Sequence, residues 1–158
     1  MKNRNRIIAI LMALIIALLG LSGCDSSTSG SGDVGGSSAT ITVTEDGSYD
    51  SKEEVCQYLI TFGHLPDNYI TKSQARKLGW QGGSLEAYAE GKCIGGDRFG
   101  NREGALPKGE EYTECDIDTL GEDSRGAKRI VFSSDGDIYY TGDHYNTFQQ
   151  LAEGWEEI

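Results

Sequence analysis

Four ionisable side chains in the second half of the chain have residue types suited to acid-base chemistry at a charged group: Glu114, Arg125, Arg129 and His144. A carboxylate can accept a proton, an imidazole can donate one near neutral pH, and guanidinium groups stabilise negative charge. If neighbouring strands bring the four together, they form a patch capable of general acid-base chemistry. From pattern alone, a solvated polar face with paired charges is favoured over a catalytic site.

After Gly91, apolar residues recur at every second position, as they do in β-strands. These strands must position the four residues. Four strands are predicted, with a hairpin turn at residues 134–137: Cys93–Phe99, Glu111–Ile117, Lys128–Ser133 and Ile138–Thr141. Phe148 and Leu151 can close a fifth. Since alternate residues face opposite sides of a strand, Glu114 and Arg129 are expected to share the open face of the sheet.

Helices are predicted before the strands. A capping box at Ser51–Glu54 begins a helix that Gly63 ends, and a second box at Thr71–Gln74 begins one that Gly79 ends. A brief third helix is expected at 84–89. The order predicts an α+β domain, with N-terminal helices packed on one face of a C-terminal antiparallel β-sheet.

The N-terminus has the features of a lipoprotein signal peptide at residues 1–23. A basic start precedes the apolar run Ile7–Leu19, which is short for a membrane span. Leu21–Cys24 resembles a lipobox, so we expect Cys24 to be lipidated; two acyl chains give stable anchoring. Ordinary signal cleavage beside an incidental cysteine is the less favoured alternative.

Residues 24–48 are rich in Ser and Gly and are predicted to be a flexible tether, which leaves 49–158 as the folded domain. Ile41 and Val43 alternate with Thr, and an edge strand and an extended linker are equally compatible with this pattern.

The composition is acidic, with 14 Lys and Arg against 25 Asp and Glu and a formal net charge of −11. Removing the signal peptide leaves 11 Lys and Arg against the same 25 Asp and Glu, a charge of −14. This balance argues against broad capture of polyanions, so any chemistry on RNA must depend on a local cluster of basic residues.

Three cysteines remain beyond Cys24, so at most one intramolecular disulfide can form. A bond between Cys56 and Cys115 is predicted, because Cys115 is expected to face the first helix, and Cys93 with Cys115 is the close alternative. No CxxC or HxxxH spacing accompanies them, so no metal site is expected.

Six runs, in order, resemble the barnase family of bacterial guanyl-preferring ribonucleases: Leu65–Ser73, Leu78–Trp80, Ile94–Asp97, Asn101–Gly104, Glu114–Ile117 and Asp143–Tyr145. Together they cover nearly all of 51–151. The resemblance implies an endoribonuclease that cleaves single-stranded RNA 3′ to guanine by transesterification to a 2′,3′-cyclic phosphate, followed by hydrolysis. It implies no metal and no cofactor.

The resemblance also implies the site residues. Glu114 is the expected general base and His144 the general acid, while Arg125, Arg129 and Lys72 are expected to hold the phosphate. Arg125 and Arg129 are further expected to keep Glu114 ionised.

The guanine-binding loop implied by the resemblance consists of Phe99, Gly100, Asn101, Arg102 and Glu103. In this loop Glu103 accepts from the base while backbone N–H groups donate to it, and Asn101 holds the turn. Tyr145 is expected to border the base or phosphate site.

The chain departs from the family in four ways. Gly100 replaces a serine, the segment from Glu114 to Arg125 is one residue longer, the domain is acidic, and the tail 152–158 has no counterpart.

The alternative function is a non-catalytic, RNA- or protein-binding lipoprotein at the cell surface. The remaining expectations are a monomer, an acidic inhibitor resembling barstar, and an extracellular location that is membrane-anchored through lipid or shed.

Overall fold

The computed structural model describes residues 41–158, so the predicted signal peptide, Cys24 and most of the tether lie outside the described residues. No strand forms at 41–44. A turn follows, in which Gly47 N donates to Thr44 O, and it is tied to the domain by the phenol of Tyr58, which donates to Glu45 O. Neither of the helices formed by residues 41–158 has the length and hydrophobicity of a membrane span.

Helix α1 spans Lys52–Phe62 and has the ends that its sequence predicts. The Ser51 hydroxyl accepts from Glu54 N and donates to Glu54 Oε2, while Gly63 adopts a left-handed conformation and donates to Leu59 O. A left-handed residue at this position costs glycine the least, which is why the helix stops there.

Helix α2 spans Lys72–Lys77 and begins with the complete capping box of Thr71 and Gln74. The third predicted helix is wrong. Residues 84–89 make one turn, in which Tyr88 N and Ala89 N both donate to Leu85 O. Gly82 and Gly83 before it and Gly91 after it have positive φ, so too few residues remain to extend past a costly first turn.

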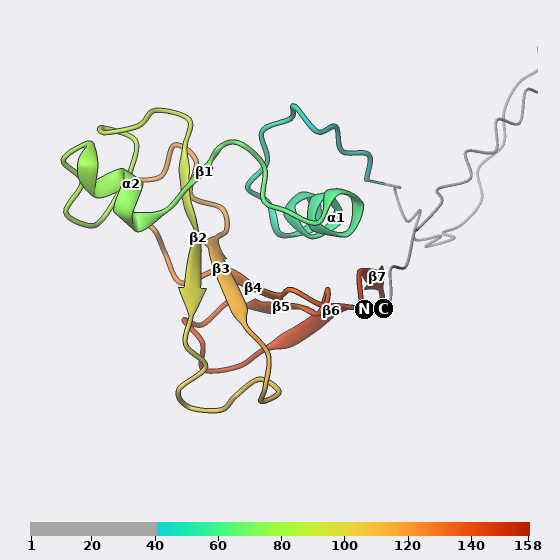
Figure 1. The fold of residues 1–158 in the computed structure, drawn as a ribbon. Coiled ribbons are helices and arrows are strands. Elements are labelled where there is room, and N and C mark those ends of the chain that lie inside the picture. Colours follow the sequence, from blue (N-terminus) through green and yellow to red (C-terminus); the bar gives the residue numbers. More distant parts are fainter. Residues whose placement is uncertain (1–40) are drawn as a thin grey trace, which may run out of the picture. The chain divides into compact units, whose positions relative to one another are not determined.

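Seven strands form one sheet, in sequence order (Figure 1). They are β1 Tyr69–Ile70, β2 Cys93–Phe99, β3 Tyr112–Asp116, β4 Arg129–Ser133, β5 Ile138–Thr141, β6 Gln149–Glu153 and β7 Glu156–Glu157. The five predicted strands are confirmed as β2 to β6, and the α+β class is confirmed with them. The short β1, which pairs in parallel with β2, and β7 were not predicted.

Helix α1 covers one face of the sheet, where Val55 and Leu59 pack against Cys115, Ile117 and Ile130 (Figure 1). The prediction that the opposite face is open is wrong. The β2–β3 loop and the loop after β5 fold over it, and Leu106, Tyr112, Val131 and Tyr139 form a second core there. Glu114 and Arg129 do share this face, but they are only 8% and 2% exposed.

The predicted disulfide is also wrong, since Cys56, Cys93 and Cys115 are all free and buried. The residue that pairs with Cys115 across β2 and β3 is Gly95, not Cys93. A side chain at Gly95 would meet the Cys115 Cβ at 2.7 Å, so the two strands approach closely there. Burial raises the pKa of the Cys93 thiol to about 11, as expected for a small apolar side chain.

The C-terminal residues extend the sheet. Strands β6 and β7 form a hairpin, and Trp155 at its tip donates its backbone N–H to Gly136 O. Trp155 also packs against the core beneath α1. Gly136 is required here, because a Cβ at this position would lie 2.3 Å from Trp155 N.

Candidate active site

Glu114 lies in the middle of β3 and is held at both carboxylate oxygens. Lys72 Nζ is 2.5 Å from Oε1, and the Tyr145 phenol donates to Oε2 across 2.8 Å. The expected partners Arg125 and Arg129 pair with another residue. The reason is strand register: Arg129 is opposite Asp116, whereas Glu114 is opposite Val131.

Lys72 reaches Glu114 because the start of α2 is fixed above β2. The Lys72 backbone N–H donates to Asp97 Oδ2 across 2.8 Å. A β-bulge at Gly96, where φ is 89°, places Asp97 opposite Glu114 in the ladder. The bulge therefore brings a lysine and a glutamate that are far apart in sequence into contact.

Asp116 is the acceptor that binds both arginines, and it is 1% exposed. Arg125 donates to it twice, with Nε 2.6 Å from Oδ2 and Nη2 2.7 Å from Oδ1. Burial works against the charged guanidinium, but the hydrogen bonds and charge of Asp116 outweigh it, and the pKa of Arg125 lies above its ordinary value. The sequence analysis assigned no role to Asp116; its position two residues after Glu114 in the same strand, and so on the same face, was the available signal.

Arg129 shapes the loop that carries Arg125. Its Nη1 donates to Arg125 O and Lys128 O at 3.0 and 2.6 Å, and its Nη2 donates to Gly126 O at 3.1 Å. Its Nε is 2.9 Å from Asp116 Oδ1, although the angle is not that of a hydrogen bond, so this contact is an ion pair. With a 3% exposed side chain, Arg129 retains few donors for a ligand, whereas Arg125 is 22% exposed and keeps its Nη1 group.

Trp80 packs beneath Arg125, whose Cζ lies 5.6 Å from the indole centroid. The indole N–H donates to Gly83 O, and the ring is 4% exposed. A cation held over an indole face is attracted by the ring's electron density. Arg125 is therefore held on one side by Asp116 and on the other by Trp80.

His144 follows β5 in a turn of unusual backbone conformation, with φ of 57° at His144 and 72° at Tyr145. Asp143 braces the turn, because its carboxylate accepts from Thr147 N, Thr147 Oγ1 and Thr141 Oγ1. Those hydrogen bonds, with Thr147 contributing most, lower the pKa of Asp143 to about 2. Left-handed residues other than glycine are costly and are concentrated at functional sites.

Tyr145 connects the parts of the site. Its ring stacks on Phe99 with a centroid distance of 5.2 Å and lies 4.9 Å from the His144 ring. Burial raises the pKa of Tyr145 well above its usual range, and the hydrogen bond and charge of Glu114 add to this effect. The phenol therefore stays protonated as a donor to Glu114.

The loop after β2 encloses a hollow of about 470 Å³, lined by residues 98–103. Asn101 has φ 41° and exchanges hydrogen bonds of 2.9 and 3.0 Å with Leu106, so its amide holds the loop closed. Gly100, Arg102 and Glu103 are exposed. Within residues 41–158, the side chains of Arg102 and Glu103 form no hydrogen bond or ion pair.

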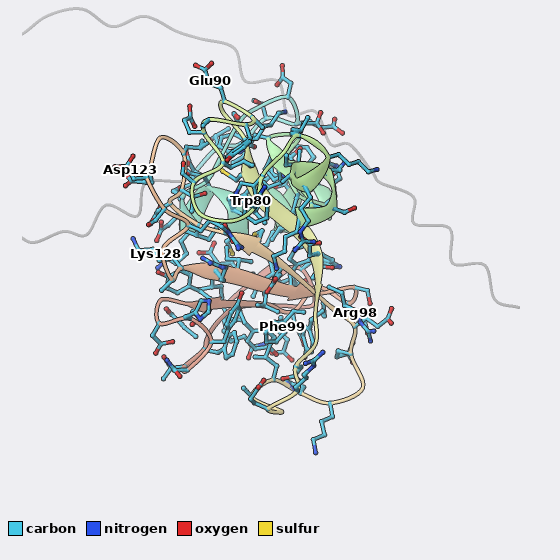
Figure 2. The ribbon with its side chains drawn as sticks, turned by 90° about the vertical axis from the view of Figure 1, so that its left-hand side faces the viewer. Trp80, Glu90, Arg98, Phe99, Asp123 and Lys128 are labelled. Carbon is cyan, nitrogen blue, oxygen red and sulfur yellow. The ribbon has the colours of Figure 1, made fainter. Side chains whose placement is uncertain are left out.

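The structure therefore connects five of these residues through direct contacts: Lys72, Glu114, Tyr145, His144 and Phe99. Separately, Asp116 forms ion pairs with both Arg125 and Arg129. Figure 2 shows Trp80 toward one end of this face and Phe99 toward the other. The arrangement combines a buried carboxylate, an exposed imidazole and cations, which are the groups needed for proton transfer at a charged substrate. In the part of the chain described, no three His, Cys, Asp or Glu residues gather as metal ligands.

Comparison with known proteins identifies the family to which the chain is related. The family model for ribonuclease matches residues 52–152. A ribonuclease of Bacillus intermedius is 48% identical over 121 residues, covering 72% of this chain and 74% of the relative. A ribonuclease of Heyndrickxia coagulans is 52% identical over 101 residues, covering 61% of this chain and 92% of the relative. Guanyl-specific ribonuclease St of Saccharopolyspora erythraea is 45% identical over 56 residues, covering 34% of this chain and 55% of the relative. The resemblance found in the sequence is confirmed, and the chain belongs to the barnase family of ribonucleases.

Proposed function

We propose that this ribonuclease is an exported, lipid-anchored enzyme that cleaves single-stranded RNA 3′ to guanine. The observation that carries the catalytic proposal is the position of Tyr145, which donates to Glu114 and adjoins the His144 ring. The guanyl-specific relative supports the base preference. The sequence Leu21–Cys24, outside the described residues, supports export and anchoring.

In the first step, Glu114 accepts the proton of the ribose 2′-hydroxyl as O2′ attacks phosphorus. Its oxygens already accept from Lys72 and Tyr145, but a carboxylate has about four lone-pair sites, so capacity remains. His144 donates its proton to the 5′-oxygen that departs. The product is a 2′,3′-cyclic phosphate. In the second step, the roles reverse and His144 takes a proton from the attacking water.

The cations stabilise the charge that grows on the phosphate oxygens in the transition state. Lys72 is paired with Glu114 in the free enzyme. When Glu114 takes the proton it loses its charge, and the Lys72 ammonium is released to the phosphate at the moment when that group becomes more negative. Arg125 adds its unused Nη1 donors, and Arg129 acts mainly by holding the Arg125 loop.

Guanine recognition is assigned to the hollow at 98–103. Glu103 accepts from N1–H and the exocyclic amine of the base, and backbone N–H groups of the loop donate to O6. Among the four bases, guanine presents these donors beside that acceptor. Phe99, stacked on Tyr145, supplies the apolar wall between the base site and Glu114.

The test is an assay of the purified mature chain on GpU, ApU and the 2′-deoxyguanosine analogue of GpU, with and without EDTA. We expect GpU cleavage with a guanosine 2′,3′-cyclic phosphate intermediate, little cleavage of ApU, and none of the deoxy analogue. Activity is expected to persist in EDTA and to follow a bell-shaped pH profile. Cleavage of the deoxy analogue, or loss in EDTA, would contradict the mechanism, and no cleavage at all would favour a binding lipoprotein.

Residue roles are tested with Glu114→Gln and His144→Ala, each expected to lower kcat roughly 10²- to 10⁴-fold, the usual contribution of a general acid or base. Glu111→Gln is the matched control, because Glu111 is an exposed carboxylate just before the same strand. Anchoring is tested separately, since Cys24→Ala should release active enzyme into the medium.

A further inference from the structure

A groove of about 510 Å³ lies between α1 and the last two strands of the sheet. Helix α1 covers this face of the sheet (Figure 1), whereas Glu114 lies on the opposite face with the second core. Three lining residues, Ile41, Glu157 and Ile158, fall outside residues 52–152, the span that the ribonuclease family model matches. The groove is therefore separate from the candidate active site, and part of its wall comes from outside the matched span.

The inner part of the groove is apolar. Cys56 is the most buried lining residue, with 7% exposure, and Ile60 and Leu151 are half-buried. Ile158 lines the same groove and is 71% exposed, whereas large apolar side chains of residues 41–158 are rarely exposed. Apolar side chains that meet at a surface hollow mark a site where a partner can bury an apolar side chain of its own.

The groove also carries an unmatched negative charge. Glu53 and Glu157 line it from α1 and β7, and both are exposed. Burial raises the pKa of the Cys56 thiol to about 11, and the charges of Glu157 and Glu53 add to the rise, so both carboxylates lie near this thiol. Lys52 is the one cation among the described lining residues, and its ammonium is 3.0 Å from Glu53. Within residues 41–158, Glu157 forms no ion pair.

The edge of the sheet beside the groove has no strand partner. Strand β7 is the last of the sheet and pairs with the second half of β6, and one further bond runs from Ile158 N to Leu151 O. Among residues 41–158, Gln149 and Gln150 accordingly pair with β5 on one side and with no strand on the other. An unpaired strand edge presents backbone N–H and C=O groups that can bind an extended peptide.

The side chains along this edge indicate which face of such a peptide enters the groove. Glu157 is opposite Ala152, which belongs to the core beneath α1, so Glu157 faces α1. Gln149 is opposite Tyr140, which packs against the same core, and it also lines the groove. Because alternate residues of a strand share a face, peptide residues two positions apart would both point toward α1.

We propose that this groove binds an extended segment of a partner protein in which a Lys or Arg is two positions from an aliphatic residue. The segment pairs with the free edge of β6, its aliphatic side chain packs against Leu151 and Ile158, and its cation pairs with Glu157. The negative charge of the groove opposes RNA and acidic proteins. Since the groove and Glu114 lie on opposite faces, the chain can hold this partner and RNA at the same time.

The test is an NMR titration of the purified mature chain with the peptide Ac-Lys-Ser-Leu-Ser-Lys-NH2, whose Lys and Leu side chains share one face when extended. We expect saturable shifts of backbone amides in α1, β6 and β7 and none in the loop 98–103. The control peptide Ac-Lys-Leu-Ser-Ser-Lys-NH2 has the same composition and charge but places Leu on the other face, so it should bind more weakly. Ac-Glu-Ser-Leu-Ser-Glu-NH2 should not bind.

Three variants test the residues. Glu157→Gln should weaken binding of the first peptide roughly two- to fivefold, the scale of an exposed ion pair. Ile158→Ser should weaken it on the order of tenfold, the lower end for burial of an aliphatic side chain. Glu111→Gln is the matched control, because it removes one exposed carboxylate just before β3 and should leave the affinity unchanged. Thermal unfolding checks the fold; if Ile158→Ser lowers Tm, Glu157→Gln and the peptide pair decide.

Equal affinity for the two peptides of the same composition would overturn the inference, because binding would then not depend on an extended strand. Equal weakening by Glu157→Gln and Glu111→Gln would show a general charge effect and overturn it as well, as would shifts confined to the loop 98–103 or no shifts at all. Self-association of wild type that Glu157→Gln abolishes would assign the groove to a second copy of the chain instead. None of these results depends on RNA cleavage, so the proposed function stands or fails separately.

Discussion

The phenol of Tyr145 donates a hydrogen bond to Glu114 Oε2 across 2.8 Å, and it does so from the residue directly after His144. This hydrogen bond links the loop after β5 to the middle of β3 and fixes the distance between them. The left-handed backbone at His144 and Tyr145 is what directs one ring toward Glu114 and leaves the other exposed.

Replacing Tyr145 with Phe should remove one donor from the buried Glu114 carboxylate while keeping the ring that stacks on Phe99. A hydrogen bond to a charged group contributes about 1.5–3 kcal/mol, so we expect roughly a tenfold to hundredfold loss of kcat. Unchanged kcat would show that this bond has no catalytic role.

Substitutions at Glu103 and Asn101 should distinguish a role in base recognition from a role in folding of the loop. Glu103→Gln is expected to lower kcat/KM on GpU while leaving Tm unchanged, since Glu103 is exposed and makes no side-chain bond in the described chain. Asn101→Ala should lower stability by about 1–3 kcal/mol, because the partners on Leu106 lose their bonds and alanine tolerates the positive φ poorly. Thermal unfolding and dinucleotide kinetics on both variants distinguish the two effects. A fall in Tm for Glu103→Gln equal to that of Asn101→Ala would contradict the assignment.

Asp116 should be a major determinant of stability. Asp116→Ala leaves Arg129 buried without its counter-charge, and breaking a buried ion pair from one side typically costs about 3–5 kcal/mol. Asp118→Ala, which breaks the exposed pair with Lys128, is the control and should change the free energy of unfolding little. Urea unfolding of both variants at one pH measures the difference. Comparable small effects would mean that Asp116 contributes no more than a surface carboxylate.

The hydrogen bonds that the Asp143 carboxylate accepts should weaken at acid pH. The pKa of Asp143 in the folded chain is about 2, below the ordinary value of 3.8, because the ionised carboxylate accepts from Thr147 and Thr141. The stabilisation is therefore fully present above pH 3.8 and is lost as the pH falls toward 2. An NMR titration of the Asp143 carboxyl carbon should give a midpoint near 2 in wild type.

Thr147→Val provides the control for that titration, since it removes the Thr147 hydroxyl donor but keeps the backbone donor. Its Asp143 midpoint should lie between the wild-type value and the ordinary one. A wild-type midpoint already at 3.8 would show that the hydrogen bonds do not stabilise the ionised form.

Much of the fold could be predicted because its signals are local. The capping boxes at Ser51 and Thr71 and the stop at Gly63 act on backbone groups within a few residues, so the ends of α1 and α2 follow from sequence. Alternation likewise placed Glu114 and Arg129 on the same face of the sheet. Where local signals were short, as at residues 84–89, packing and flanking glycines decided the outcome.

The sequence by itself thus determined helices α1 and α2, strands β2 to β6, the shared face of Glu114 and Arg129 and, through its resemblance, the ribonuclease family. Only the tertiary structure decided which charges meet. Lys72, rather than an arginine, binds Glu114, because the bulge at Gly96 and the register of β3 with β4 bring those groups within hydrogen-bonding distance. Coulomb attraction and burial depend on distances of a few ångströms between residues remote in sequence, and no local pattern encodes such distances.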